Sequence, residues 1–151
     1  MRPILFVLFA IFIVSCNNES EIRERFERYE NGVVSKHYTT VDGLKQGELK
    51  DFYPSGKLMA IRNFVDDKEE GRSRIFYESG APKEVQYFTK GLKNGGDTIW
   101  YENGGVQFTV SFIHNKKTGP LQKWAPDGSL LFEAHYRHDS LVRVSKEMIK
   151  R

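Results

Sequence analysis

Apolar and polar residues alternate with a period of two in several stretches of the chain. The even-numbered positions are apolar from 106 to 112 and again from 130 to 136, and the odd-numbered positions 107, 109 and 111 are polar. Such alternation is typical of a strand with one covered face. The other face is not plainly polar, because it would carry Met59, Ile61 and Val85. The pattern therefore predicts half-buried antiparallel strands, both of whose faces are partly apolar.

Several series of residues recur every 24 positions. One glycine series ends five turn-like tetrapeptides, a second lies between them, and aromatic residues precede or begin most of the tetrapeptides. The first series is Gly32, Gly56, Gly80, Gly104 and Gly128, the second is Gly47, Gly71, Gly95 and Gly119, and the aromatics are Phe52, Phe76, Trp100 and Trp124, with Tyr53, Tyr77 and Tyr101. Series that stay in register without insertions predict a repeat protein of about five units.

Each unit is expected to form a hairpin. Tetrapeptides such as Tyr-Pro-Ser-Gly suit a type I turn with the glycine in the left-handed region, which gives a three-residue loop. This register predicts that Glu48 faces Arg62 and that Arg74 faces Glu84. It also places the Phe52 to Trp124 series on the face of the even-numbered residues after Gly104.

Other turns and one proline punctuate the same pattern. A second turn is expected in each unit near 42–43, 66–67, 90–91 and 114–115, where Gly, Asp and Asn are frequent and favour the left-handed backbone. Pro82 lies within a strand position and lacks a donor, so it marks an edge, a bulge or the end of the neighbouring strand.

The N-terminus has the pattern of a secretory signal peptide. Residues 4–14 form an apolar run of eleven after the positive start at Arg2, and Ser15 and Cys16 follow it. The run is too short to span a membrane, which requires about 20 apolar residues. We therefore predict a signal peptide over 1–15. Cys16 is the single cysteine, so no internal disulfide can form.

The sequence Ile13-Val14-Ser15-Cys16 resembles the lipobox of bacterial lipoproteins, with Ile13 where Leu is usual. The resemblance implies that Cys16 carries a diacylglyceryl group and becomes the first residue after cleavage. The protein would then be exported and anchored in the membrane of a bacterial cell envelope. Residues 16–28 are expected to form a polar tether, either a solvated spacer or an amphipathic helix docked on the domain. A repeat domain over 29–144 and a basic tail over 145–151 would follow.

The tetrapeptides Tyr-Glu-Asn-Gly and Tyr-Pro-Ser-Gly, each near an aromatic residue, resemble MORN repeats. Their spacing is closer to the MORN-variant repeat of bacterial proteins similar to the YwqK-type antitoxin family. The resemblance covers about residues 26–140. It implies an all-β fold, an elongated antiparallel meander in which each repeat adds one hairpin. It also implies a link with membranes or a role as a protein scaffold, as for some MORN proteins.

Composition and motifs exclude several function classes. The net charge is +3 with acids and bases interspersed, so no basic block points to nucleic acid. The histidines, at 37, 114, 135 and 138, lack the spacing and companions of a metal site, since 135 is expected on a strand and 138 in a turn. No nucleophile elbow or phosphate-binding loop is present. We therefore predict no enzyme, no metal and no cofactor, although two carboxylates distant in the chain could still meet.

These observations predict a lipid-anchored envelope lipoprotein whose repeat surface is a non-catalytic protein-binding or scaffold module. Its partners would be the membrane, through the anchor, and another envelope protein or polymer. An antitoxin or immunity-like protein is the alternative, and an envelope glycan hydrolase is a third candidate. A sheet with exposed aromatics would favour the first function, and a cleft with two close carboxylates would favour the hydrolase. The sequence leaves the oligomeric state open.

Overall fold

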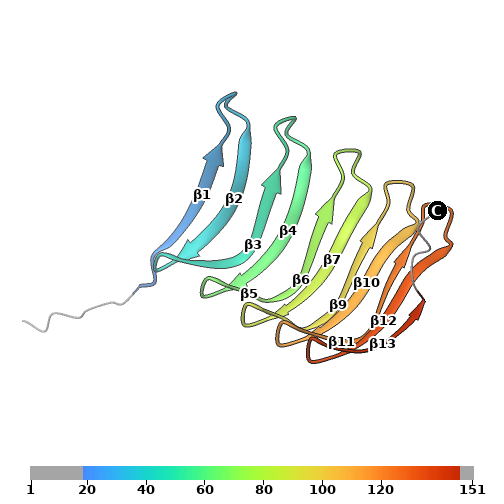
Figure 1. Cartoon of the computed structure of the whole chain (residues 1–151). Helices are drawn as coiled ribbons and strands as arrows, with labels where there is room; N and C mark the ends of the chain where they lie inside the picture. Colours follow the sequence, from blue (N-terminus) through green and yellow to red (C-terminus); the bar gives the residue numbers. More distant parts are fainter. Residues whose placement is uncertain (1–18, 147–151) are drawn as a thin grey trace, which may run out of the picture.

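The described part of the chain is one open antiparallel sheet. The computed structural model describes residues 19–146, which contain thirteen strands and no helix, with strands making up 69% of the structure (Figure 1). The strands follow one another across the sheet in chain order. This arrangement confirms the predicted all-β fold of stacked hairpins.

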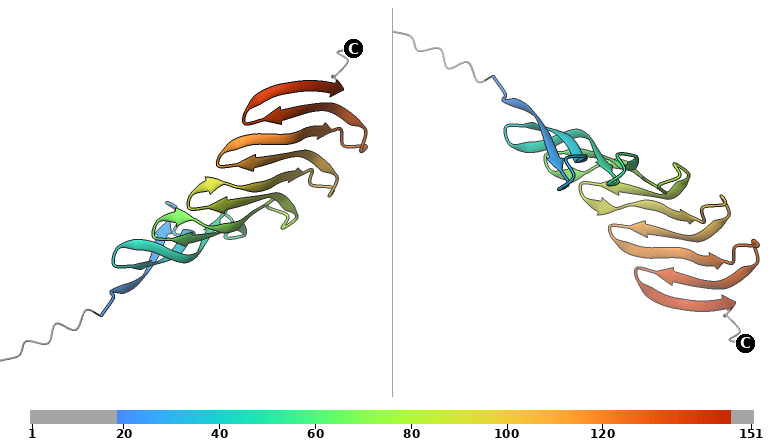
Figure 2. Two further views of the ribbon diagram at one scale, coloured as in Figure 1. Left: turned by 90° about the horizontal axis from the view of Figure 1, so that it is seen from below. Right: turned by 90° about the horizontal axis from the view of Figure 1, so that it is seen from above.

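Eleven strands form the continuous path, and two short ones branch from it. The path consists of β1 (Ile22–Arg28), β2 (Val34–Val41), β3 (Leu44–Phe52), β4 (Leu58–Val65), β6 (Gly71–Phe76), β7 (Pro82–Thr89), β9 (Gly95–Trp100), β10 (Val106–Ile113), β11 (Lys116–Trp124), β12 (Leu130–Arg137) and β13 (Ser140–Lys146). The short strands are β5 (Lys68–Glu69), which pairs with β4, and β8 (Leu92–Lys93), which pairs with β7. The sheet is curved, and Figure 2 shows that it twists from one end to the other, as right-handed strands require.

The tetrapeptides form the predicted hairpin loops. The Tyr53 amide donates to the Lys57 carbonyl at 2.8 Å, and the Gly56 amide donates to the Tyr53 carbonyl at 2.8 Å. The same pair of hydrogen bonds recurs in the other four units. The closing glycine is in the left-handed region, as at Gly80 with φ +90°. The turn geometry is therefore local and is repeated at each copy of the motif.

The second turns are also confirmed, and they link neighbouring units. Asp66 and Asp67 have φ values of +49° and +62°, the left-handed values expected there. The Lys45 amide donates to Asp67 Oδ1 at 2.9 Å, and the Asp67 amide donates back to the Lys45 carbonyl at 3.1 Å. The side chains of Asn115 and Asp139 accept equivalent bonds from residues 93 and 117. Each such turn therefore joins two successive hairpins.

A β-bulge changes the register that the turns alone predicted. Phe52 pairs with Leu58, but the next pair is Asp51 with Ala60, so one extra residue is inserted in β4. As a result Arg62 faces Leu49 and not Glu48. The next unit has the same shift, and Arg74 faces Val85 while Glu84 faces Ile75. Both predicted charge pairs are wrong, because a bulge moves every later partner by one residue.

The bulge also reverses one assignment of faces. Trp100 pairs with Val106, whereas its neighbour Ile99 pairs with Phe108. Since adjacent residues of a strand point to opposite faces, Trp100 lies opposite to Phe108 and Val110. The Phe52 to Trp124 series was predicted to share a face with the even-numbered residues of β10. This prediction is wrong beyond the first pair, Trp100 with Val106. Pro82 begins β7 at such a bulge, and a bulge was one of the three positions predicted for this proline.

One face of the sheet, which we call the inner face, contains the core. Its buried apolar residues are Leu49, Ala60, Val110 and Ala134, each at most 4% exposed, and its buried polar residues include Asp51, Ser73 and Asp97. No large side chain is fully buried among the described residues. The core is therefore thin, and neighbouring side chains of a single curved layer cover one another. The opposite, outer face carries Phe52, Phe76, Trp100 and Trp124.

Both ends of the sheet extend further than the sequence predicted. Residues Ile22–Arg28 are β1 and pair with β2, so this part of the expected tether belongs to the repeat domain. The prediction of a spacer or helix there is wrong, because these residues are extended and pair with β2 along their whole length. Ser145 and Lys146 likewise belong to β13 and not to a tail. The predicted signal peptide, Cys16 and residues 147–151 lie outside the described residues.

Candidate protein-binding surface

An apolar stripe crosses the outer face near the hairpin loops. It consists of four aromatic residues and the residues that pair with them across each hairpin, and we call it the aromatic stripe. Its members are Phe52 with Leu58, Phe76 with Pro82, Trp100 with Val106, and Trp124 with Leu130. All remain at least partly accessible, and Val106 is 36% exposed. The stripe is thus an apolar surface that remains accessible and is not buried in the core of the inner face.

A ladder of tyrosine hydroxyls holds the backbone of this stripe. Tyr77 Oη donates to the Trp100 carbonyl at 2.7 Å, from one unit to the next. The same bond joins each tyrosine of the tetrapeptides to the aromatic residue 23 positions later. The other bonds are Tyr29 to Phe52 at 2.6 Å, Tyr53 to Phe76 at 2.7 Å, and Tyr101 to Trp124 at 2.8 Å. Burial, followed by the charge of Glu78, raises the pKa of Tyr53 and keeps this donor protonated.

A hollow opens on the stripe at Trp100. It has a volume of about 270 Å³ and is lined by Arg72, Pro82, Val85, Trp100 and Gly104. The lining combines an indole, two small apolar side chains and one exposed guanidinium. A partner could place an apolar side chain there beside an acceptor for the Arg72 guanidinium. A second hollow, of about 410 Å³, lies at the other turns and is lined by Val65, Asp66, Lys68, Glu70 and Lys90.

The second glycine series lies opposite an aromatic series of the inner face. Gly47, Gly71, Gly95 and Gly119 pair across the sheet with Phe64, Phe88, Phe112 and Tyr136 respectively. Lysines cover three of these rings, with Lys93 Nζ 5.0 Å from the Phe112 centroid. These pairs lie on the inner face, so they serve packing more than they offer a ligand site.

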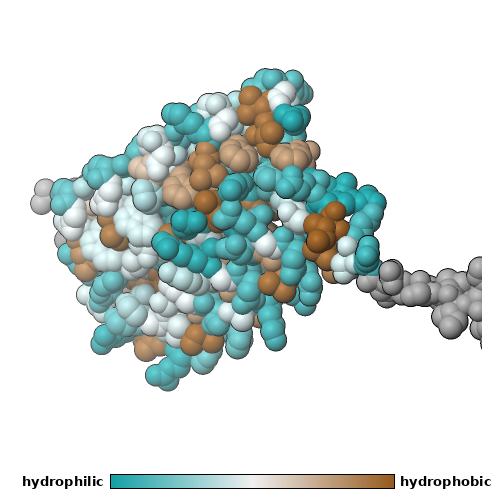
Figure 3. Space-filling view, turned by 180° about the vertical axis from the view of Figure 1, so that it is seen from behind, coloured by the Kyte–Doolittle hydropathy of each residue, from teal (hydrophilic) through white to brown (hydrophobic). Residues whose placement is uncertain are grey.

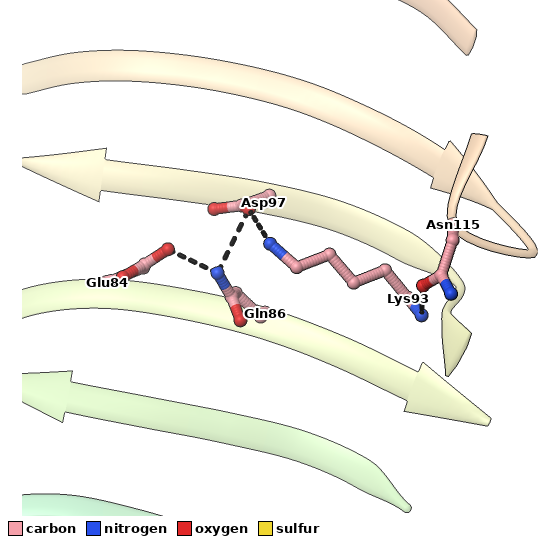
Figure 4. A network of polar contacts seen from close by, with 5 residues as sticks. All are labelled: Glu84, Gln86, Lys93, Asp97 and Asn115. Atoms are coloured by element: carbon pink, nitrogen blue, oxygen red, sulfur yellow. Dashed lines mark hydrogen bonds and ion pairs between the residues drawn. The ribbon is translucent and has the colours of Figure 1, made fainter. Parts of the chain in front are cut away.

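A group of polar side chains interrupts the core in the middle units, and we call it the central polar cluster. It comprises Asp51, Arg62, Glu69, Ser73, Glu84, Gln86, Lys93 and Asp97. Figure 4 shows Gln86 between Glu84 and Asp97, and Lys93 reaching the same aspartate. Asp97 Oδ2 accepts from Gln86 Nε2 and Lys93 Nζ, both at 3.1 Å. Arg62 Nη2 lies 3.3 Å from Asp51 Oδ2 in an ion pair.

The electrostatics of the central polar cluster are those of crowded carboxylates. Burial raises the pKa of Glu69. The hydrogen bond from Ser73 and the charge of Arg62 lower it again, but only in part. Burial and the charge of Asp97 raise the pKa of Glu84. Asp97 Oδ1 and Glu69 Oε1 are buried without a hydrogen-bond partner. The cluster therefore holds buried carboxylates that are only partly compensated, and it makes the stability of the sheet depend on pH.

The carboxylates do not form the open cleft that a glycan hydrolase would need. Glu84 and Asp97 are close enough to affect each other, but Gln86 and Lys93 occupy the space around them (Figure 4). Neither hollow described above contains either carboxylate in its lining. Within residues 19–146, no three His, Cys, Asp or Glu side chains are arranged to hold a metal ion. His135 is on β12 and His138 in the following turn, as predicted.

The remaining surface is mixed. On the side shown in Figure 3, apolar residues form separate patches between hydrophilic ones. In the part of the chain that the structure describes, no helix has the length and hydropathy needed to cross a membrane. The aromatic stripe is therefore the feature of the outer face that combines apolar side chains, a hollow and a fixed backbone.

Comparison with known families supports the repeat assignment. A family model described as the MORN repeat variant matches residues 45–66, which cover β4, most of β3 and the loop between them. No curated protein matches the chain. The chain thus contains a MORN-variant repeat, a kind of module that generally binds proteins or membranes and is not catalytic.

Proposed function

We propose that the protein is a lipid-anchored lipoprotein of a bacterial cell envelope and that its repeat domain is a non-catalytic binding module for another envelope protein. The observation that carries the binding role is the aromatic stripe, with its hollow of about 270 Å³ at Trp100. Partly exposed aromatic and aliphatic side chains on a rigid backbone are typical anchors of protein interfaces. The match to the MORN repeat variant supports a binding role of the same kind.

The binding role can be tested with a photo-reactive amino acid in the full chain, expressed in its own envelope. Position 72 lies at the hollow on the aromatic stripe, and position 90 lines the second hollow. We expect position 72 to cross-link to one defined envelope protein and position 90 not to. Val85→Glu should abolish this cross-link, because a carboxylate would replace an apolar contact. Equal cross-linking from both positions would contradict the assignment, and cross-linking to a polymer alone would identify a different partner class.

The anchor is a separate part of the proposal and rests on Ile13-Val14-Ser15-Cys16. Several acyl chains bind a bilayer far better than one, since each buried CH₂ contributes about 0.8 kcal/mol. Metabolic labelling with a fatty-acid probe should mark the wild-type chain and not Cys16→Ser. Equal labelling of the two chains would exclude acylation at this cysteine and leave the binding role untouched.

A further inference from the structure

The first strand of the sheet has a free edge. β1 pairs with β2 on one side, and among residues 19–146 no strand lies on its other side. All seven residues of β1 are exposed, with Ile22 70% and Phe26 52% exposed. A free edge of this length presents unpaired backbone donors and acceptors and is a template for another strand.

The sequence of β1 is charge-complementary to itself in the antiparallel direction. Residues 24–28 read Glu-Arg-Phe-Glu-Arg. If Phe26 faces Phe26 of a second copy, Arg25 faces Glu27 and Glu24 faces Arg28, and the two-fold axis repeats both pairs. A shift of one residue would set Glu24 against Glu27 and Arg23 against Arg28. Opposite charges across an antiparallel pair are favourable and like charges are not, so the charges select one register.

We propose that the free edge of β1 pairs antiparallel with β1 of a second copy of this chain, with the two-fold axis at Phe26. Such an isologous contact continues the sheet through both copies and keeps the inner faces on the same side. It also covers two exposed Phe26 rings. Phe26 is already fixed for this contact, since it stacks on His37 with centroids 4.3 Å apart and planes at 6°. The inference does not depend on the lipid anchor or on the aromatic stripe.

The other edge of the sheet does not offer an equivalent contact. β13 ends the path, and its charged residues are Arg143 and Lys146, both basic, so it cannot form opposite-charge pairs with itself. β1 and β13 run in the same direction, because neighbours along the path of eleven strands alternate. A contact between β1 of one copy and β13 of another would therefore pair the two strands in parallel. An antiparallel pairing of these strands would place the inner face of one copy beside the outer face of the other.

Two variants at the edge make the proposal testable. The Arg25 side chain forms no hydrogen bond or ion pair within the described residues, and only its backbone pairs with Tyr38 of β2, so R25E changes the edge and not the fold. Glu27 pairs with Lys36 at 3.1 Å, and E27R gives up this exposed contact. In a homodimer each variant places like charges opposite one another at two equivalent positions. Mixing the two variants makes all of these pairs attractive again, and the double variant R25E/E27R does the same within one chain.

The full chain in detergent micelles can be measured by sedimentation equilibrium. We expect the wild type to dimerise reversibly and R25E to weaken the dimer about tenfold or more. The mixture of R25E with E27R, and the double variant, should return to within about threefold of the wild type. Arg143→Glu on β13 is the matched control and should leave the dimer unchanged. A monomeric wild type, a dimer indifferent to R25E, or a dimer weakened only by Arg143→Glu would each overturn the proposal.

Discussion

The Tyr77 hydroxyl donates a hydrogen bond of 2.7 Å to the Trp100 carbonyl and so fastens one repeat unit to the next. Four such bonds run along the sheet, each across 23 residues. In the fifth tetrapeptide Ala125 stands where the others have tyrosine. The tyrosines of the motif thus link units and fix the backbone of the aromatic stripe.

Tyr77→Phe should destabilise the domain by about 1 kcal/mol, because the Trp100 carbonyl loses a donor in a half-buried position. A chemical denaturation midpoint measures the loss. Tyr87→Phe is the matched control, since Tyr87 is 42% exposed and its hydroxyl forms no hydrogen bond within the described residues. Equal midpoints for the two variants would mean that the hydroxyl ladder contributes nothing to stability.

Gly95→Ala should cost more than Gly71→Ala. Gly71 has φ +77° and open space where a Cβ would lie, whereas Gly95 has φ +133° and its Cβ would lie 2.9 Å from the Tyr87 Cβ. Left-handed strain alone costs about 1–2 kcal/mol, and the clash at Gly95 adds to it. Thermal unfolding followed by circular dichroism would rank the two variants. The reverse order would contradict the described close approach of β9 to β7.

Asn115 separates two contributions to the second turns. It has φ +66°, and its Oδ1 accepts from the Lys93 amide at 2.6 Å. Asn115→Gly keeps the left-handed backbone and loses the hydrogen bond, at about 1 kcal/mol. Asn115→Ala should lose more, because it adds backbone strain. Gly91, which occupies the equivalent position one unit earlier, is the natural precedent for the first change. Denaturation midpoints that place alanine at or above glycine would refute this division.

Glu84→Gln should stabilise the domain at neutral pH. Burial and Asp97 raise the pKa of Glu84, so the folded state binds this proton more tightly than the unfolded state. Stability is therefore lost as the pH rises from the ordinary pKa of a glutamate through the raised pKa. The variant removes that loss. Because solvent screens the charge in part, we expect a melting temperature only about 1–3 °C higher than that of the wild type at pH 7, and no gain near pH 4.

Glu133→Gln provides the control of opposite sign. A hydrogen bond from Gln122 lowers the pKa of Glu133, so its ionised form stabilises the folded state above the ordinary pKa of a glutamate. That contribution is lost as the pH falls through the lowered pKa. The variant should therefore melt lower than the wild type at pH 7 and match it in acid. Melting curves that shift in the same direction for both glutamates would contradict this account.

The features that the sequence predicted correctly are those with local causes. A turn such as Tyr53-Pro54-Ser55-Gly56 sets its own backbone geometry, and the repeat spacing then assembles the sheet. The strand partners beyond the first pair of each hairpin were predicted wrongly, because the bulge at Met59 and its equivalents depends on how neighbouring strands twist together. No turn residue signals that bulge. The recurrence of a tyrosine 23 residues before an aromatic was visible and could have indicated the ladder.

The central polar cluster was missed for a different reason. Several of its members lie at repeat positions that are apolar in other units, as Asp51 compares with Ile75, and Asp97 with Leu49 and Leu121. Aligning the units would have shown polar residues where the core requires apolar ones. The sequence could not show that these residues meet, because that depends on the register, which the bulges had changed.

The reach of the contacts has a kinetic consequence. Within residues 19–146, no hydrogen bond or strand pairing joins residues more than 23 positions apart, the span of the bond from Tyr77 to Trp100. Folding that requires only short loops to close is fast, and nucleation in one unit can spread to the next. A chain that emerges N-terminus first can complete each hairpin once about one further unit has appeared. The sheet can then grow as fast as the chain is synthesised, and little unpaired strand is exposed at any time.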